Sequence, residues 1–314
     1  MRKTLFILTR SLIPIVYNAT KYLWKKYIQK SLDHLEISRE EYNIIVRKIL
    51  NLLKNKELTT KEIKIALNTQ VRISEIIKIM CDKCLLIRGH PIKSWKDRRL
   101  YYARFQDYFP KLNLNIYNEQ DSTITLIEKY IDAYGPVTLE DIAWWSGIGK
   151  NKINPAIFKL ENKIERIKIS QLSYEFLISK KDTDKLELIN QNKVSTINFL
   201  PLLDPYMMSY KNRERYISSK YYNYVYNRAG NATSTIMLNG KVIGVWDFTE
   251  KPDCFLKYYL FEDIFPNLLT LIHKQGERIG KFLIGSKVKL KKCIFMEKLT
   301  DRNAGGFMAP LKNC

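Results

Sequence analysis

Residues 199–216 read Phe199-Leu-Pro-Leu-Leu-Asp-Pro-Tyr-Met-Met-Ser-Tyr-Lys-Asn-Arg-Glu-Arg-Tyr216, and residues 235–246 read Thr235-Ile-Met-Leu-Asn-Gly-Lys-Val-Ile-Gly-Val-Trp246. In the second stretch, Asn239-Gly240 separates two apolar runs. This pattern predicts a β-hairpin, because a type I′ turn needs positive φ at both central residues. In the first stretch two prolines exclude a regular helix, and a segment that alternates Tyr with Lys and Arg follows. No simple packing requirement explains why the prolines are followed by alternating tyrosines and basic residues.

Working outward, two capping boxes mark helices in the first half of the chain, Ser38-x-x-Glu41 and Thr59-x-x-Glu62. Apolar residues at helical spacing follow the first box over residues 42–53, and a short helix follows the second. A third apolar series, at 73–84, predicts a helix that ends near residues 88–89. The basic, strand-like segment 90–102 comes next. Three helices followed by a β-ribbon is the order of a winged helix-turn-helix.

The same order returns about 79 residues later, because aligning Thr59 with Thr138 also aligns Glu62 with Asp141. We expect helices near 124–134 and 154–164, then wing strands at 166–169 and 174–178. A polar connector at 182–193 precedes the hairpin. A strand at 254–261, an amphipathic helix at 265–284 and a basic edge strand at 287–298 complete the pattern.

The predicted fold class is therefore α+β, with tandem winged helix-turn-helix domains followed by a C-terminal α/β-hairpin domain. The expected boundaries are 38–118 and 119–182 for the winged helices and 193–314 for the C-terminal domain.

The composition favours a polyanionic partner. Lys and Arg number 53 against 32 Asp and Glu, a formal net charge of +21. Such an excess points to nucleic acid first and to an anionic membrane second, although the chain is rich in Lys throughout. The apolar fraction of 46% is enough for packed cores.

The five cysteines are odd in number and scattered, which does not indicate a disulfide framework. Cys81-x-x-Cys84 has the spacing of a zinc knuckle, but no second pair of ligands follows, so we expect both thiols to pack in a core. No metal and no small-molecule cofactor are expected. The apolar run after Arg2-Lys3 is interrupted at Arg10 and Pro14, and no stretch is long enough to span a bilayer. These features predict a reduced, cytoplasmic protein without a membrane partner.

Together, Leu-Pro-x-x-Asp-Pro-Tyr-x-x-x-Tyr-Lys-x-Arg and Thr-x-x-x-Asn-Gly-x-Val-x-Gly-x-Trp resemble the C-terminal half of the AlkZ/YcaQ-like family. These are winged-helix proteins, some of which are DNA glycosylases that remove alkylated or crosslinked bases. Residues 134–147 are similar to the family's third winged helix. Met1-Arg-Lys-Thr-Leu5 resembles its Met-Arg-Gly-Thr-Leu-His-Leu stretch, with Phe6 in the position of His. The resemblance implies that residues 1–37 are the remnant of a preceding winged helix.

In that family base excision is assigned to a Gln-hydrophobic-Gln or Gln/His-hydrophobic-Asp motif upstream of the Met-Arg stretch. The present sequence begins at that stretch. It carries no such motif elsewhere: Gln106 and Asp107 are adjacent, without the hydrophobic residue that the motif has between its two polar residues. It also has no Gly-rich phosphate loop, no His-Glu-x-x-His and no nucleophile elbow. The catalytic residues are therefore unknown, and whether the protein is an enzyme stays open.

Basic residues interleaved with aromatic ones predict the DNA contacts. In the third helix Arg72, Lys78 and Lys83 are offset by Glu75 and Asp82, so we expect little base reading there. Asp204 either orients an arginine by a bidentate pair or caps a turn. The predicted DNA-binding residues are Lys93, Trp95, Lys96, Arg98 and Arg99 in the first wing, Lys150 and Lys152 at a helix start, and Tyr210, Lys211, Arg213 and Arg215.

We therefore expect a monomeric protein that binds double-stranded DNA without an intact glycosylase motif. The first alternative is a DNA glycosylase that acts on alkylated or crosslinked bases. The second is a winged-helix scaffold that binds other proteins.

Overall fold

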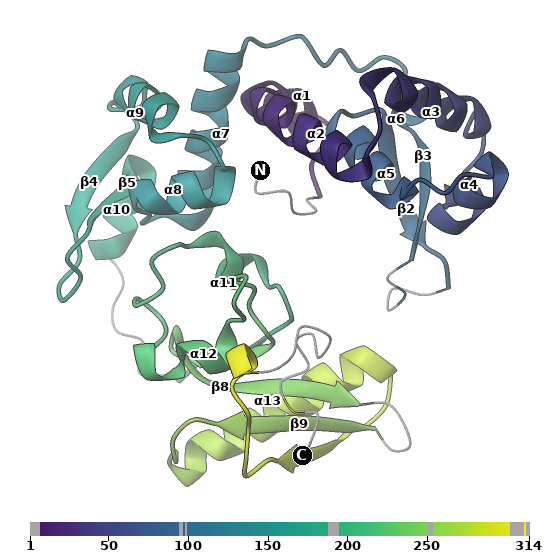
Figure 1. The fold of residues 1–314 in the computed structure, drawn as a ribbon. Helices are drawn as coiled ribbons and strands as arrows, with labels where there is room; N and C mark the ends of the chain where they lie inside the picture. Colours follow the sequence, from purple (N-terminus) through teal and green to yellow (C-terminus); the bar gives the residue numbers. More distant parts are fainter. Residues whose placement is uncertain are drawn as a thin grey trace. The chain divides into compact units, whose positions relative to one another are not determined.

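The structure is a computed structural model that describes residues 7–93, 97, 99–187, 195–249, 254–301 and 311. The chain divides into two compact units, residues 1–129 with 146–160 and residues 130–145 with 161–314 (Figure 1). Each unit is described separately.

Helices dominate the first unit, beginning with α1 (Leu12–Thr20), α2 (Tyr22–Leu35), α3 (Arg39–Leu52), α4 (Thr60–Leu67) and α5 (Ile73–Asp82). The two predicted capping boxes are confirmed. Ser38 N donates to the Glu41 carboxylate at 2.7 Å and Thr59 N donates to that of Glu62 at 2.7 Å, while each hydroxyl accepts from the backbone N–H three residues on. These bonds satisfy backbone donors that a helix start otherwise leaves open, and so fix where α3 and α4 begin.

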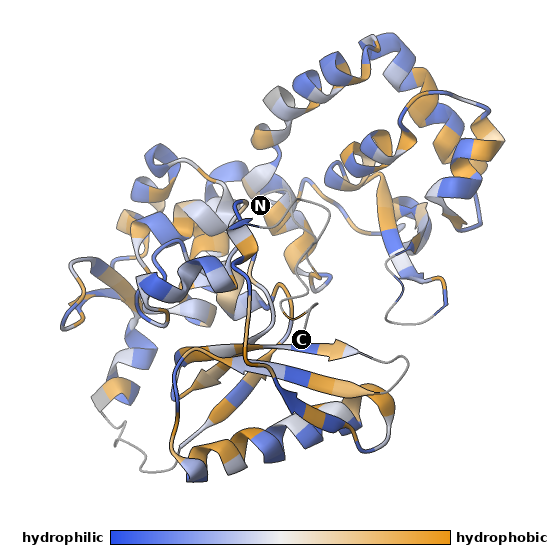
Figure 2. Ribbon diagram, turned by 60° about the horizontal axis from the view of Figure 1, so that its bottom comes forward, coloured by the Kyte–Doolittle hydropathy of each residue, from blue (hydrophilic) through white to orange (hydrophobic). Residues whose placement is uncertain are grey.

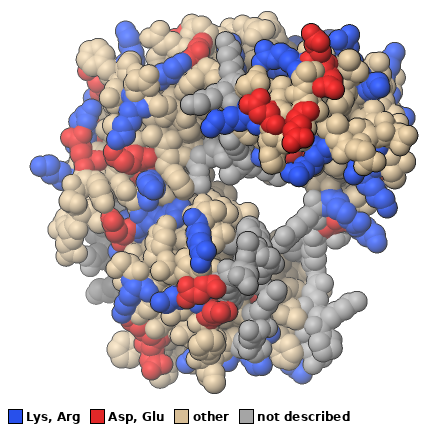
Figure 3. Space-filling view, viewed as in Figure 1, with Lys and Arg blue, Asp and Glu red and all other residues tan. Residues whose placement is uncertain are grey.

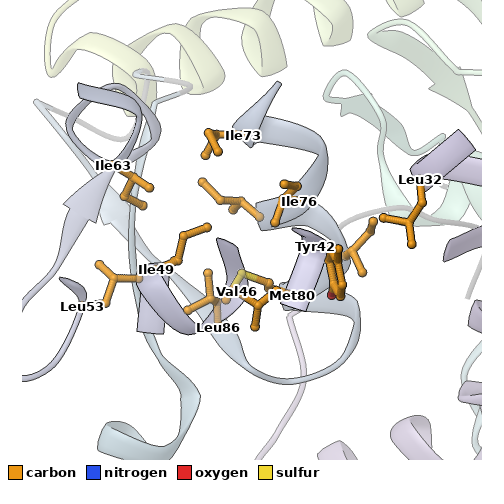
Figure 4. Close-up of a cluster of buried hydrophobic side chains, with 12 residues drawn as sticks. Leu32, Tyr42, Val46, Ile49, Leu53, Ile63, Ile73, Ile76, Met80 and Leu86 are labelled. Atoms are coloured by element: carbon orange, nitrogen blue, oxygen red, sulfur yellow. The ribbon is translucent and has the colours of Figure 1, made fainter. Parts of the chain in front are cut away.

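One apolar cluster joins α3, α4 and α5 (Figure 4). Its side chains are spaced three and four residues apart along each helix, which places them on one face. A small sheet with the order β1-β3-β2 lies in the same unit, built from β1 (Leu58–Thr59), β2 (Leu86–Pro91) and β3 (Leu100–Arg104). The fully or nearly fully buried members of the cluster are Leu32, Tyr42, Val46, Ile49, Leu53, Ile63, Ile73, Ile76, Ile77, Ile79, Met80 and Leu86.

Two boundary predictions in this unit are wrong. Helix α5 ends at Asp82, because Cys84 adopts a left-handed φ of 52° and the chain then enters strand β2. The thiol of Cys84 therefore lies beyond the helix. Helix α2 runs through to Leu35, so it continues across the polar residues from Ser31 onward, where the sequence favours a break around residues 31–37.

The chain continues as α6 (Phe105–Tyr108), α7 (Glu119–Tyr134), α8 (Leu139–Ser146) and α9 (Lys150–Lys159). Strands β4 (Ile164–Lys168) and β5 (Glu175–Ser179) then pair antiparallel as the sequence predicted, with Ile164 opposite Ser179. Of the expected polar connector at 182–193, the first six residues belong to helix α10 (Lys180–Glu187), and residues 188–193 lie outside the described residues.

A five-stranded sheet organises the rest of the second unit, in the order β10-β9-β8-β7-β6. Asn239 and Gly240 have φ values of 48° and 79°, which confirms the predicted hairpin turn. All pairs are antiparallel except β9 with β10, which are joined through helix α13 as a parallel pair requires. The strands are β6 (Ile197–Leu200), β7 (Thr235–Leu238), β8 (Lys241–Thr249), β9 (Phe255–Leu260) and β10 (Lys289–Lys292).

Helix α13 (Pro266–Ile284) packs on one face of this sheet through Ile272, which is fully buried. Two glycines let its backbone approach strand β10. A Cβ on Gly276 would lie 2.5 Å from Leu290, and one on Gly280 would lie 2.0 Å from Val288. The alternation of apolar and polar residues along the strands and the apolar stripe of α13 are visible in Figure 2. Short helices α11 (Pro205–Ser209) and α12 (Tyr222–Val225) lie between β6 and β7 in the chain.

Within the described ranges, no helix is both long enough and apolar enough to cross a membrane. The same residues contain no group of three His, Cys, Asp or Glu that could hold a metal ion. Cys81, Cys84 and Cys254 are free thiols.

Candidate nucleic-acid interface

The basic arm between β2 and β3 carries two described cations, Lys93 and Arg99, both exposed. Arg99 forms two side-chain hydrogen bonds with Asp97, Nε to Oδ1 at 2.9 Å and Nη2 to Oδ2 at 2.7 Å. These bonds hold the pKa of the Asp97 carboxyl at about 2, so Asp97 stays charged and partly neutralises Arg99. Trp95, Lys96 and Arg98 lie outside the described residues.

Two cations, one on α5 and one just after its end, lie near aromatic rings of their own unit. Lys78 Nζ lies 5.6 Å from the centre of the Tyr27 ring, and Lys83 Nζ lies 5.4 Å from that of Tyr42. Burial lowers the pKa of Lys83. These contacts engage both ammonium groups within the protein, whereas a recognition helix needs free side chains on its groove-facing side, so weak base reading by α5 stays a prediction.

At the start of α9, Lys150 is exposed, but Lys152 is engaged inside its own unit. Its ammonium forms a close ion pair with Glu119 and lies 3.7 Å from the centre of the Tyr22 ring. Of the two predicted contacts, Lys150 is therefore the more exposed one.

The segment Tyr210–Arg215 is held by a buried carboxylate, Asp141, which has no exposed surface. Its Oδ1 accepts from the backbone N–H groups of Lys211 and Asn212 at 2.7 and 3.0 Å. Its Oδ2 accepts from Thr138 N at 2.9 Å, which closes a third capping box at α8. This one side chain joins the helix start to the family-like segment.

Asp141 also binds Arg215. The Arg215 Nη2 atom lies 3.1 Å from Asp141 Oδ2, and its Nη1 donates to Pro136 O at 2.6 Å. The guanidinium is 4.3 Å from the centre of the Tyr210 ring. With a side-chain exposure of only 14%, Arg215 supports the local fold instead of facing solvent.

Arg213 is buried in a similar way, with an exposure of 4%. Its three nitrogens donate to Tyr210 O, Tyr222 Oη and Gly230 O at 2.7–3.1 Å, and its guanidinium lies 3.7 Å from the centre of the Tyr226 ring. These contacts correct our expectation that Arg213 and Arg215 face a ligand. Tyr210 is buried as well, and its hydroxyl donates to Tyr134 O.

Of the two roles that the sequence left open for Asp204, the structure shows the cap of a turn and corrects the role of orienting an arginine. Its Oδ1 accepts from Tyr206 N at 2.8 Å, and it forms the N-cap of α11. Burial raises the pKa of this carboxyl. The carboxylate that pairs with an arginine is Asp141, and the capping pattern Thr138-x-x-Asp141 was the part of the sequence that could have pointed to it.

Lys211 remains the exposed cation of the family-like segment. Its backbone N–H is fixed by Asp141, and its ammonium lies 5.1 Å from the centre of the Trp144 ring. On the face drawn in Figure 3, Lys and Arg are spread over both units with Asp and Glu among them. Charge alone therefore does not single out one binding surface on that face.

A model of the family described as "DNA glycosylase AlkZ-like" matches residues 1–282, nearly the whole chain. The chain belongs to this family. Family membership suggests a function in DNA repair or DNA binding. No curated protein matches the sequence.

Among solved structures, the chain is similar to the Streptomyces sahachiroi DNA glycosylase AlkZ, with a TM-score of 0.71 and 16% sequence identity. The match covers 93% of the present chain and 80% of that protein. At this identity the likeness concerns the mixed α+β fold. It agrees with the family assignment, which rests on the sequence.

Proposed function

We propose that this member of the AlkZ-like family is a monomeric DNA-binding protein that holds double-stranded DNA through phosphate contacts, and that binding, not base excision, is its principal activity. The observation that carries the proposal is the exposed pair Lys93 and Arg99 on the β2–β3 arm, in a chain of formal charge +21. Exposed lysine and arginine neutralise phosphates and release counterions, which supplies most of the affinity in binding of this kind.

The arrangement of elements supports tandem winged helices. The order α3, α4, α5, β2, β3 recurs as α7, α8, α9, β4, β5, with a capping box at the second helix in both cases. We assign residues 38–118 and 119–182 to these two modules, residues 1–37 to part of a preceding one, and residues 193–314 to the C-terminal domain.

The buried arginines narrow the proposal to particular side chains. Arg213 and Arg215 use their donors within the protein, so we assign them to shaping the segment that presents Lys211. The contacts to DNA then come from Lys93, Arg99, Lys150 and Lys211.

The experiment is a titration of fluorescently labelled duplex DNA followed by anisotropy over a series of salt concentrations. When the logarithm of the binding constant is plotted against the logarithm of the salt concentration, a slope of about −0.9 per phosphate contact supports the proposal. Binding that does not weaken between low and moderate salt contradicts it and favours the protein-binding scaffold.

Removal of alkylated or crosslinked bases is the second candidate, which the family's own description favours. Such an enzyme must extrude the base and stabilise a positively charged sugar while it positions water. The test uses duplex DNA that carries N7-alkylguanine, scored for abasic sites. Repeated turnover would contradict our proposal, whereas tight binding without abasic sites supports it.

A further inference from the structure

On the face of the five-stranded sheet opposite α13, the part formed by β9 and β10 is chemically unlike the α13 side, whereas Val245 and Thr235 on β8 and β7 are fully buried there. Along β9 the residues Leu256, Tyr258 and Leu260 are buried on the α13 side. Between them, Phe255, Lys257 and Tyr259 keep part of their surface exposed. Because side chains alternate across a strand, these three lie together on the other face.

Strand β10 adds two exposed lysines to this face. In the parallel register Lys289 is the partner of Phe255, and Lys291 is the partner of Lys257. The ammonium of Lys289 lies 5.9 Å from the centre of the Phe255 ring, so both side chains are on the same side of the sheet. We call Phe255, Lys257, Tyr259, Lys289 and Lys291 the aromatic–lysine face.

The row of rings extends beyond the end of β9. Phe261 follows Tyr259 at a centroid distance of 6.0 Å, and the ring of Tyr221 is stacked on it at 4.4 Å with an interplanar angle of 13°. Strand β8 places one acidic residue, Asp247, beside Lys257 in the register. Three lysines against one aspartate leave the face positively charged.

We propose that the aromatic–lysine face binds unpaired single-stranded DNA. Part-exposed rings on a flat sheet can stack on bases that have left the duplex, whereas paired bases present only their edges and phosphates. Lys289 and Lys291 are two residues apart on one strand, about 6.6 Å, and can follow successive phosphates. Sheet platforms that combine stacking rings with lysines bind single strands with little sequence preference.

This inference shares its partner class with the proposed function but uses none of the residues assigned to duplex binding. The two are therefore separable. A protein that retains single strands but not duplex DNA would contradict the proposed function and leave the aromatic–lysine face intact. The reverse result would contradict the present inference alone.

The experiment measures the affinity of the full chain for a labelled oligothymidine and for a duplex of the same length, again by anisotropy. The double variant Phe255→Leu with Tyr259→Leu keeps apolar side chains at both positions but removes the rings. We expect it to weaken single-strand binding roughly five- to 100-fold, because stacking on an aromatic ring contributes about 1–3 kcal/mol per base. Duplex affinity should stay unchanged.

A second variant keeps the test decisive if the ring variant does not fold. Lys289→Ala with Lys291→Ala should reduce the slope of log K against log salt by about 1.4, two contacts at about 0.7 each for a single strand. The matched control is Lys274→Ala with Lys281→Ala, which removes two exposed lysines of α13 and the same total charge.

Equal losses in the lysine variant and the control would overturn the proposal, as would unchanged single-strand affinity in both test variants. RNA of the corresponding sequence forms a further arm. Tighter binding of RNA than of DNA would contradict the assignment to DNA, because the 2′-hydroxyl is the group that distinguishes them.

Discussion

The carboxylate of Asp141 lies 3.1 Å from the guanidinium of Arg215, 74 residues further along the chain. The same carboxylate also accepts from the backbone at Lys211 and Asn212. The carboxylate that caps helix α8 thus fixes the backbone of the segment on which the family resemblance depends. A buried carboxylate with this many donors is an anchor, because each donor would otherwise be left without a partner.

Asp141→Asn is expected to lower the free energy of unfolding by about 3–5 kcal/mol, because it removes one partner of a buried ion pair and leaves the Arg215 charge uncompensated. Urea denaturation followed by circular dichroism measures the change. The matched control is Asp204→Asn at the half-buried α11 cap, where Asn is as good an N-cap as Asp and little change is expected. Equal losses in the two variants would show that Asp141 is an ordinary cap.

Leu203 is expected to be a position where substitution stabilises the protein. It has a φ of 58° and is 44% exposed, so it combines a left-handed backbone with little burial. Leu203→Asn should raise the free energy of unfolding by about 0.5–1 kcal/mol, because Asn tolerates this conformation better than Leu. Leu203→Val should lower it, because a β-branched side chain fits positive φ poorly. The same sign of change for both variants in thermal unfolding would contradict this account.

The stability of the first unit should fall as the pH rises from about 9 to about 12. Burial raises the pKa of the Cys81 and Cys84 thiols to about 12, above the ordinary value of 9.0. Within this range the unfolded chain loses thiol protons that the folded chain keeps, so proton release favours unfolding as the pH increases. Tyr42, whose pKa burial raises to about 12, acts in the same direction.

Urea midpoints measured from pH 8 to pH 11 test this, with Cys81→Ala and Cys84→Ala as the variants. Each alanine variant should flatten the decline above pH 9. If a variant with both substitutions shows the same decline of the urea midpoint with pH, these thiols do not contribute to the pH dependence of stability. The raised pKa values also fit the prediction that Cys81 and Cys84 pack in a core, since a metal-binding thiol must lose its proton readily.

Asp97→Asn is expected to strengthen duplex binding. The carboxylate engages Arg99 with two hydrogen bonds and places a negative charge on the arm. Its removal frees one cation and removes one repulsive charge, so affinity at low salt should rise by roughly three- to 30-fold, with a steeper salt slope. A fall in affinity would mean instead that Asp97 holds Arg99 in its binding geometry.

Local sequence rules predicted the elements that are decided by neighbouring residues. The boxes at Ser38, Thr59 and Thr138 and the turn at Asn239-Gly240 appear where the sequence placed them, because each depends on bonds within a few residues. The end of α5 was missed because Cys84 continues the apolar spacing while its backbone turns left-handed. The apolar pattern does not distinguish these two situations.

The predicted site was harder to derive, since exposure depends on contacts distant in sequence. Arg213 and Arg215 have the composition of a ligand-binding stretch, but their partners include Gly230, Pro136 and Asp141. The order and spacing of residues within the segment do not predict those partners. The pairing of Phe255 with Lys289 likewise arises only once β9 and β10 lie in parallel.

The salt dependence of duplex binding in a variant with Lys93, Lys96, Arg98 and Arg99 all changed to alanine tests the central claim most directly. Its control is Arg47, Lys48, Lys54 and Lys61 changed to alanine, four exposed cations of α3, α4 and the loop between them. We expect the arm variant to bind DNA more weakly and to lose about 0.9 in slope for each phosphate contact, while the control loses little. Unchanged affinity and slope in the arm variant, or equal losses in both, would contradict the account.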